Sequence, residues 1–415
     1  MADRISTYQV FNRGLNSLNR LNTQLDKTNE QIATGRRLVT PADDPIAASR
    51  VLELDQQITQ SEQYITNIKA ARGRLEQQES LVSTVEDLIT RIRELTIAAG
   101  NGGYTKSDRE ALAAELRIRS DEILGLMNSK DTNGDYYFAG FSSSTEPFER
   151  LASGGVEYKG DEGQRYLQIS LSNTVATNDN GKRLFVDIES ESPSFLTKGN
   201  ALNRGSGRIL EGMILDQEQF AKDLYPDDAV IQFNNVNDID PPGPNISVKR
   251  LSDGRVLNGL DRVAYSPAVP INFSGLDIKI VGEPRPGDSF IVETSGKMPL
   301  LGTIDRLAYG LERLGDGPEE TQALSELVQD SLGNLKNSLD RASEVRAQIG
   351  ARLNVLDSTQ DMHQDLILAS KGIRAELADL DYAEAVTRFS METFILESTQ
   401  RTFAKLSGLR LFDYL

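Results

Sequence analysis

The chain has 415 residues, of which 38% are hydrophobic and 26% are charged, and its formal net charge is −17. This length is sufficient for two or three domains, each with its own core. Because an acidic surface repels phosphate groups, we expect no nucleic acid and no membrane surface as a partner. Cysteine is absent, which excludes disulfides and thiolate metal ligands, and the single histidine is His363.

Two features bear on membranes and export. No apolar run approaches the ~20 residues that a membrane-spanning helix requires. The N-terminal residues show no apolar signal core, so we expect no cleaved signal peptide, and export by another route stays open.

The distribution of proline divides the chain into three parts. Eleven of the fourteen prolines fall between Pro147 and Pro299, and none follows Pro318. Because proline inside a helix costs ~3 kcal/mol, long helices can form on both sides of this stretch. We therefore expect a mainly α fold with a β-rich insert. Its long N- and C-terminal helices would pair as a coiled coil or helical bundle, with a central, mostly β domain between them.

The first predicted helix covers residues 5 to about 34 and would be ~45 Å long at 1.5 Å per residue. Its apolar seam positions recur at alternating steps of four and three, with two asparagines among them. The members of this seam are Phe11, Leu15, Leu18, Asn22, Leu25, Asn29 and Ile32. This spacing is typical of a helix that packs along a partner helix.

A helix break and two helix starts follow. Gly35 can adopt the left-handed conformation that ends a helix. Asp44 before Pro45 is typical of an N-cap followed by proline at the first helical position. The second helix is expected to end at 101–103, and Ser107 with Glu110 predicts a capping box for the third.

The middle of the chain, from about 135 to 300, has the patterns of short strands. Two apolar runs, 166–171 and 184–188, flank Asn180-Gly181, which predicts a tight hairpin. Further strands are predicted at 246–251, 276–281 and 290–292.

The last third returns to helical spacing, and its apolar face continues almost to the C-terminus. We expect three domains: a terminal coiled coil from 1–40 and 375–415, a helical bundle from 41–135 and 300–374, and a β-rich outer domain from 136–299. Little chain remains beyond the terminal stripes to cover them, so we expect contacts between subunits there. The predicted interface residues are Leu15, Leu18, Leu25, Ile32, Ile373, Leu377, Leu380, Phe389, Phe403 and Leu406.

The sequence predicts no catalytic, cofactor or metal site. It contains no phosphate-binding loop, and His363 lies on a helical seam, where we interpret it as a structural residue. The segment 131–135 is similar to the start of a calcium loop, but Gly134 comes two residues too early and Ser142 stands where a glutamate is required. We therefore predict a turn.

Several motifs resemble the hook-associated protein 3 family of flagellin-like proteins. They are Ile-Ala-Thr-Gly-Arg-Arg at 32–37, Pro-Ala-Asp-Asp-Pro at 41–45, Asn-Gly-Asp-Tyr-Tyr-Phe-Ala-Gly at 133–140, Leu-Asp-Tyr-Ala-Glu-Ala at 380–385 and Leu-Phe-Asp-Tyr-Leu at 411–415. The resemblance covers both helical ends well and the middle weakly.

The resemblance implies a non-enzymatic junction subunit of the extracellular flagellum, exported unfolded through the flagellar type III channel. Its implied partners are hook-associated protein 1, flagellin, an export chaperone and copies of itself in a ring. Two alternatives stay open. One is a flagellin, although the two prolines around the Asp-Asp pair are unusual for one, and the other is a secreted enzyme with a carboxylate site in the β insert.

Overall fold

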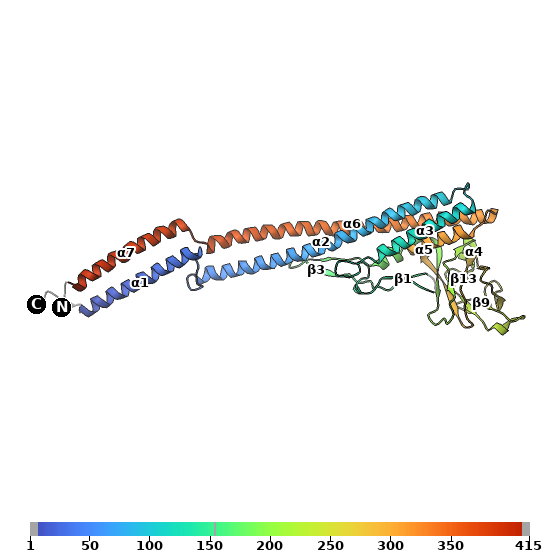
Figure 1. Cartoon of the computed structure of the whole chain (residues 1–415), viewed down its shortest axis with the longest axis horizontal. Helices are drawn as coiled ribbons and strands as arrows, with labels where there is room; N and C mark the ends of the chain where they lie inside the picture. Colours follow the sequence, from blue (N-terminus) through green and yellow to red (C-terminus); the bar gives the residue numbers. More distant parts are fainter. Residues whose placement is uncertain (1–6, 153–154, 409–415) are drawn as a thin grey trace. The chain divides into compact units, whose positions relative to one another are not determined.

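The computed structural model describes residues 7–152 and 155–408 and confirms a mainly α protein with a β-rich insert (Figure 1). Its long helices are α1 (Thr7–Thr34), α2 (Pro45–Ala99), α3 (Lys106–Met127), α5 (Leu300–Arg313), α6 (Pro318–Ala378) and α7 (Tyr382–Gly408). No helix within the described ranges is both long and apolar enough to cross a membrane.

Contacts divide the chain into two compact units. The first comprises the described parts of Met1–Asn67 and Ser358–Leu415, and the second is Ile68–Asp357. The second unit contains the β-rich insert together with the helices around it, so the expected division into three domains stays a prediction. Helices α2 and α6 each contribute a segment to both units.

The first unit is built from antiparallel stretches that are distant in sequence. Helix α1 lies beside α7 (Figure 1). The early part of α2 contacts the late part of α6 through the rings of Tyr64 and His363, whose centroids are 5.2 Å apart. An ion pair between Arg374 and Asp55, with an N–O distance of 3.1 Å, joins the same two segments.

The local signals between the first three helices are largely confirmed. Gly35 has a φ of +69° and ends α1, and the Ala47 amide donates a 3.0 Å hydrogen bond to the N-cap carboxylate of Asp44. The capping box of α3 is real but begins two residues earlier than predicted. Thr105 and Asp108 form it, because Thr105 is the last residue with extended backbone before the helix.

The helical core of the second unit surrounds α5. Along this helix nearly every side chain is buried, including the apolar Ile304 and Leu307 and the charged Asp305 and Arg306. Residues of α2, α3 and α6 supply much of the rest of this core, together with residues such as Phe138 and Phe185 that lie outside these helices. A helix buried on all sides must satisfy its polar side chains internally, and α5 does so through partners on β strands and on α3.

Among its described residues, the insert has five small antiparallel sheets and a second core. The largest sheet has the order β10-β9-β8-β14-β5, formed by β10 (Val263–Ala264), β9 (Asn245–Arg250), β8 (Ala229–Phe233), β14 (Ser289–Lys297) and β5 (Glu189–Gly199). The others are β11-β12-β7 (Ile271–Phe273, Leu276–Ile278, Met213–Ile214), β13-β6 (Ile280–Val281, Arg208–Ile209), β1-β2 (Phe148–Arg150, Val156–Tyr158) and β3-β4 (Tyr166–Gln168, Thr174–Ala176). A short helix, α4 (Gln217–Asp223), covers part of this second core with Phe220.

The hairpin predicted at Asn180-Gly181 is wrong. Residues Lys182–Val186 form a π-helical turn, and the first of the two predicted strands pairs instead with β4. The adjacent side chains of Leu184 and Phe185 are both buried in the helical core. A strand points successive side chains to opposite faces, so it could not bury both on one side. Tertiary packing therefore overrides the local turn signal.

Gly181 provides a test of this packing. A Cβ at Gly181 would lie 2.6 Å from the ring of Phe148, so we expect Gly181→Ala to lower the free energy of unfolding by about 1–3 kcal/mol. Gly73→Ala is the matched control, since Gly73 is exposed within α2 and nothing lies within 4 Å of its added Cβ. It should raise the same quantity by about 0.5–1 kcal/mol. Urea denaturation measures both, and equal effects of the two changes would contradict the packing described.

Candidate functional site

The candidate functional site is the helix pair α1–α7, several of whose large apolar side chains are exposed. Near the start of α1 and the end of α7, the rings of Phe11 and Phe403 lie 5.2 Å apart. A Cβ at Gly14 would come within 2.6 Å of the Phe403 ring, so glycine at this position lets the ring approach the backbone of α1 closely. Aromatic contact therefore closes this end of the pair.

The side chains that this pair buries fully are mostly polar. Among the described side chains of α1, only Thr28 and Gln31 are fully buried, and on α7 only Ala385 and Glu392 are. The carboxylate oxygen Oε2 of Glu392 has no hydrogen-bond partner within the part of the chain that the structure describes. Burying a polar atom without a partner is unfavourable, and a polar layer contributes little apolar burial. The contact between these two helices alone is therefore weakly stabilised.

Large apolar side chains of the pair stay exposed. On α7, Met391 is 65% and Phe394 70% exposed, and on α1, Phe11 is 44% and Leu15 38% exposed. We define the terminal-helix surface as the set Phe11, Leu15, Val386, Met391, Phe394 and Ile395, all of them exposed. Fully burying one such side chain contributes about 1.5–3 kcal/mol, so covering this surface would stabilise the pair substantially.

The predicted interface residues fall mostly at the edge of this surface. Leu15 and Ile373 are exposed, and Leu380 is buried in the turn before α7. The side chain of Leu406 lies outside the described residues. Six others are half-buried: Leu18, Leu25, Ile32, Leu377, Phe389 and Phe403. Only the Phe403 ring has a resolved ring contact across the pair, with Phe11.

Sequence reasoning placed Val386 and Phe394 on the apolar face of the last helix but did not select them as interface residues, and it left out Met391 and Ile395. All four are among the most exposed apolar side chains of α7. The seam rule selects residues that face one partner helix, and α1 is that partner within the same chain. The residues that flank the seam are the ones left uncovered. The signal that could have found them is an apolar stripe on α7 wider than a two-helix seam requires.

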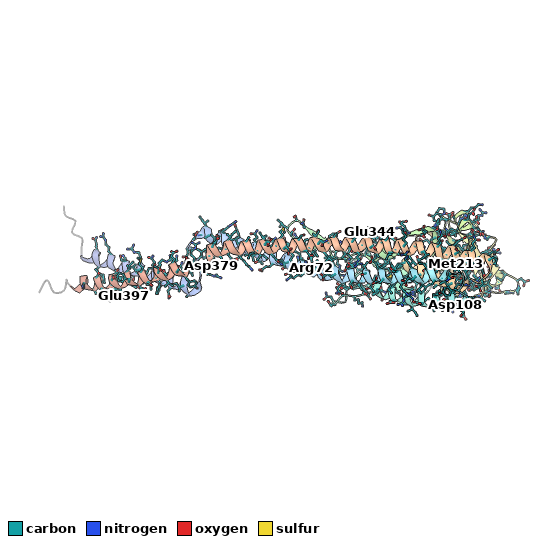
Figure 2. The ribbon with its side chains drawn as sticks, turned by 90° about the horizontal axis from the view of Figure 1, so that it is seen from above. Arg72, Asp108, Met213, Glu344, Asp379 and Glu397 are labelled. Atoms are coloured by element: carbon teal, nitrogen blue, oxygen red, sulfur yellow. The ribbon has the colours of Figure 1, made fainter. Side chains whose placement is uncertain are left out.

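Hydrogen bonds join the residues after α1 to the short turn between α6 and α7. Asp379 marks this turn in Figure 2. The Arg37 amide donates to the Ala378 carbonyl at 2.7 Å, and the Leu380 amide donates to the Gly35 carbonyl at 3.0 Å. The guanidinium of Arg37 also donates to the carbonyl of Leu377 at 2.6 Å. These bonds set the register in which α1 and α7 leave the turn.

Asp43 stabilises the loop that follows α1. One carboxylate oxygen accepts hydrogen bonds from the Val39 and Thr40 amides at 3.1 and 3.0 Å, and the other pairs with Lys27 of α1 at 2.6 Å. The hydrogen bond from Lys27, followed by that from the Thr40 amide, lowers the pKa of Asp43 to about 2. The loop is therefore tied to α1 by a charge that persists in mild acid.

The remaining chemical candidates have structural partners. His363 is buried beside Tyr64. Asp131 forms the predicted turn, since its Oδ1 accepts from the Asn133 and Asp135 amides at 2.8 and 3.0 Å and its other oxygen pairs with Arg74. Within residues 7–152 and 155–408, no group of three or more potential metal-ligating side chains comes together.

The Asp43 carboxylate generates a pH-dependent prediction. Its pKa is lower in the folded state than its ordinary value of 3.8, so its contribution to stability is complete above about pH 4 and is lost as the pH falls through about 2. Carbon NMR titration of this carboxyl group should give a midpoint near 2 in the native chain and a higher one in Lys27→Met. Lys336→Met, which removes an exposed ion pair in the other unit, should leave the midpoint unchanged. An ordinary midpoint in the native chain would contradict the contact.

Comparison with known proteins agrees with this arrangement. The chain is 25% identical over 410 residues to flagellar hook-associated protein 3 of Salmonella typhimurium, and the alignment covers 99% of each protein. The crystal structure of flagellar hook-associated protein 3 from Legionella pneumophila has 26% identity and a TM-score of 0.53, and the match covers 79% of this chain and 98% of that one.

Similarity to a filament protein covers about a third of the chain. Residues 5–143 match the bacterial flagellin N-terminal helical region. The flagellar filament 41 kDa core protein of Borreliella burgdorferi is 27% identical over 133 residues, which are 32% of this chain and 38% of that protein. The resemblance seen in the sequence motifs is confirmed: this flagellar protein is similar to flagellar hook-associated protein 3 over 99% of its length, and its residues 5–143 match the flagellin N-terminal helical region.

Proposed function

We propose that this chain is a structural junction subunit of the flagellum, which joins hook-associated protein 1 on the hook to the flagellin filament. The observation that carries this proposal is the helix pair α1–α7, in which no large apolar side chain among those described is fully buried. Similarity to hook-associated protein 3 over 99% of the chain supports the junction role specifically.

Assembly would proceed by coupled folding of the terminal helices. Most helix stability in proteins comes from packing of an apolar face, and α1 and α7 have one side of that face uncovered. Ordering the helices costs conformational entropy, which burial of the terminal-helix surface against neighbouring subunits offsets. The helices would thus become fully stable only inside the assembled structure.

The partners that we propose follow from the family. Neighbours in the junction would be copies of the same chain in a ring, with hook-associated protein 1 on one side and flagellin on the other. An export chaperone would bind the chain before it leaves the cell for the extracellular flagellum. In this role the chain acts through its surfaces, and we assign it no catalytic activity.

A filament subunit is the alternative with some support, because residues 5–143 match the flagellin helical region. That match ends at residue 143, so it does not bear on the rest of the chain. The filament protein of Borreliella burgdorferi aligns with only about a third of this chain, whereas the junction relative aligns throughout. We therefore favour the junction.

Substitution of Phe394, which is 70% exposed on α7, tests the assembly role. Phe394→Asp should be exported but not incorporated into flagella, because a carboxylate cannot be buried between subunits without a partner. The matched control is Leu202→Asp, since Leu202 is 84% exposed on the insert. We expect the control to assemble and both purified variants to unfold at the same urea concentration as the native chain.

The measurement is complementation of cells that lack this protein. Immunolabelled electron microscopy of flagella gives incorporation, and the amount of the chain in the medium gives export. A Phe394→Asp protein that takes its normal place in the flagellum would contradict the role of the terminal-helix surface. Labelling along the whole filament by the native chain would favour the filament alternative.

A further inference from the structure

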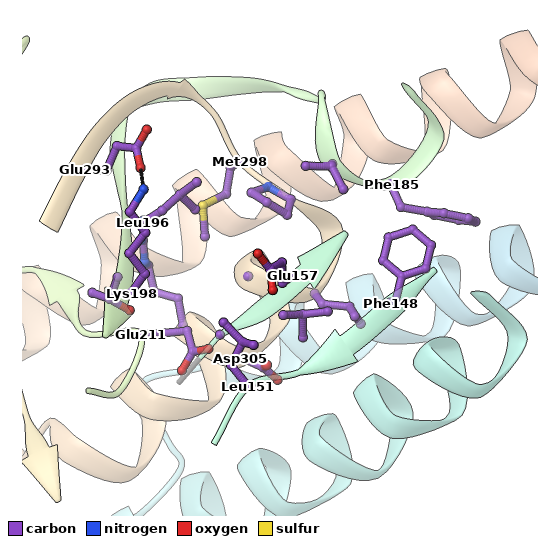
Figure 3. Close-up of a pocket in the computed structure, with 18 of the residues that line it drawn as sticks. Phe148, Leu151, Glu157, Phe185, Leu196, Lys198, Glu211, Glu293, Met298 and Asp305 are labelled. Carbon is purple, nitrogen blue, oxygen red and sulfur yellow. Dashed lines mark hydrogen bonds and ion pairs between the residues drawn. The ribbon is translucent and has the colours of Figure 1, made fainter. Parts of the chain in front are cut away.

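The second unit contains a cavity of about 210 Å³ that the structural role does not use. It lies between the β1–β2 hairpin, strand β5 and the first turns of α5 (Figure 3). An apolar cavity of ~150 Å³ in another protein holds a benzene molecule, so this one has room for a ring and a few further atoms.

The two ends of the cavity differ in chemistry. Phe148 and Phe185 lie at one end in Figure 3, and Lys198, Glu211 and Glu293 lie toward the other. The apolar end is part of the helical core, whose side chains there are almost completely buried. An occupant therefore needs an apolar body and a polar group at opposite ends.

Most charged groups around the polar end already have partners. Lys198 pairs with Glu293 at 2.5 Å. The carboxylate of Asp305 accepts hydrogen bonds from Ser120 and Arg150, both at 2.8 Å. Arg306 donates to the Ser194 hydroxyl at 2.5 Å and to the Phe195 carbonyl, and its guanidinium lies 4.1 Å from the centroid of the Phe195 ring.

Glu211 is the exception. No side chain of the described residues forms an ion pair with its carboxylate or donates a hydrogen bond to it. Burial, followed by the charge of Asp305, raises the pKa of Glu211. A hydrogen bond from its own backbone amide and the charges of Arg150 and Arg306 only partly oppose this. A half-buried carboxylate in this setting is stabilised by a cation brought next to it.

We propose that this cavity binds a small organic cation, whose ammonium group pairs with Glu211 and whose aromatic or branched apolar body packs against Phe148 and Phe185. Four carboxylates line the cavity, namely Glu157, Glu211, Glu293 and Asp305, against Lys198 and Arg306, so its net charge excludes anions. A neutral ligand of the same shape would fill the apolar end but leave Glu211 without a counter-ion.

The test compares three probes of one shape on the full-length protein by isothermal titration calorimetry at neutral pH. Benzylamine carries the cation, benzyl alcohol is its neutral isostere, and benzoate is the anion. We expect benzylamine to bind at least about tenfold more tightly than benzyl alcohol, because a hydrogen bond between charged groups is stronger than a neutral one. Benzoate should not bind.

Two variants locate the ammonium site. Glu211→Gln should remove the preference for benzylamine over benzyl alcohol while binding of the alcohol persists. Glu157→Gln, a matched change at an exposed carboxylate of the same cavity, should retain the preference. Equal binding of the amine and the alcohol to the native chain, absence of binding by both, or an unchanged preference in Glu211→Gln would each overturn the proposal.

Discussion

Each terminal helix has an apolar stripe that is wider than its contact with the other helix can cover. This limit determines which side chains of α1 and α7 stay exposed. Where α1 meets α7, the shared seam covers one side of each helix and leaves Phe394 and Met391 in water. The pair buries the polar side chains of Gln31 and Glu392, whereas the large apolar residues of its seam stay half-buried. The pair is thus held in register mainly by the hydrogen bonds at its base, around Arg37 and Leu380. The exposed apolar side chains of the pair can be buried only by other molecules. A subunit that assembles with its neighbours requires such a surface.

The second unit, in contrast, encloses its core within itself. Helix α5 is enclosed on all sides, and its charged residues have partners within the unit, as Asp305 has in Ser120 and Arg150. The insert has a separate apolar core around Phe220 and Phe290. A chain with one self-sufficient unit and one incomplete unit can complete the core of the first on its own, while its terminal helices remain available to neighbouring subunits. The cavity at Glu211 belongs to the finished unit, so occupation of that cavity and assembly of the terminal helices are physically separate questions.

The sequence predicted the features that depend on short-range chemistry. Gly35 ends α1 and Asp44 caps the start of α2, and both effects act within one helical turn. The hairpin at Asn180-Gly181 was wrong because burial of Leu184 and Phe185 involves distant residues such as Phe138. In the candidate site, seam spacing selected mostly the side that α1 and α7 share, and the predicted subunit interface stays a prediction. The cavity could not be predicted, since its walls come from strands and a helix separated by more than a hundred residues.

Hydrogen–deuterium exchange of the free chain and of assembled flagella tests the central claim most directly, because exchange reports how often each helix opens. In the free chain, amides of α1 and α7 should exchange rapidly while those of α5 stay protected. In assembled flagella, α1 and α7 should become as protected as α5. If α1 and α7 of the solitary chain were already protected to the same degree as α5, the helix pair would be complete without neighbours, and the account would be wrong.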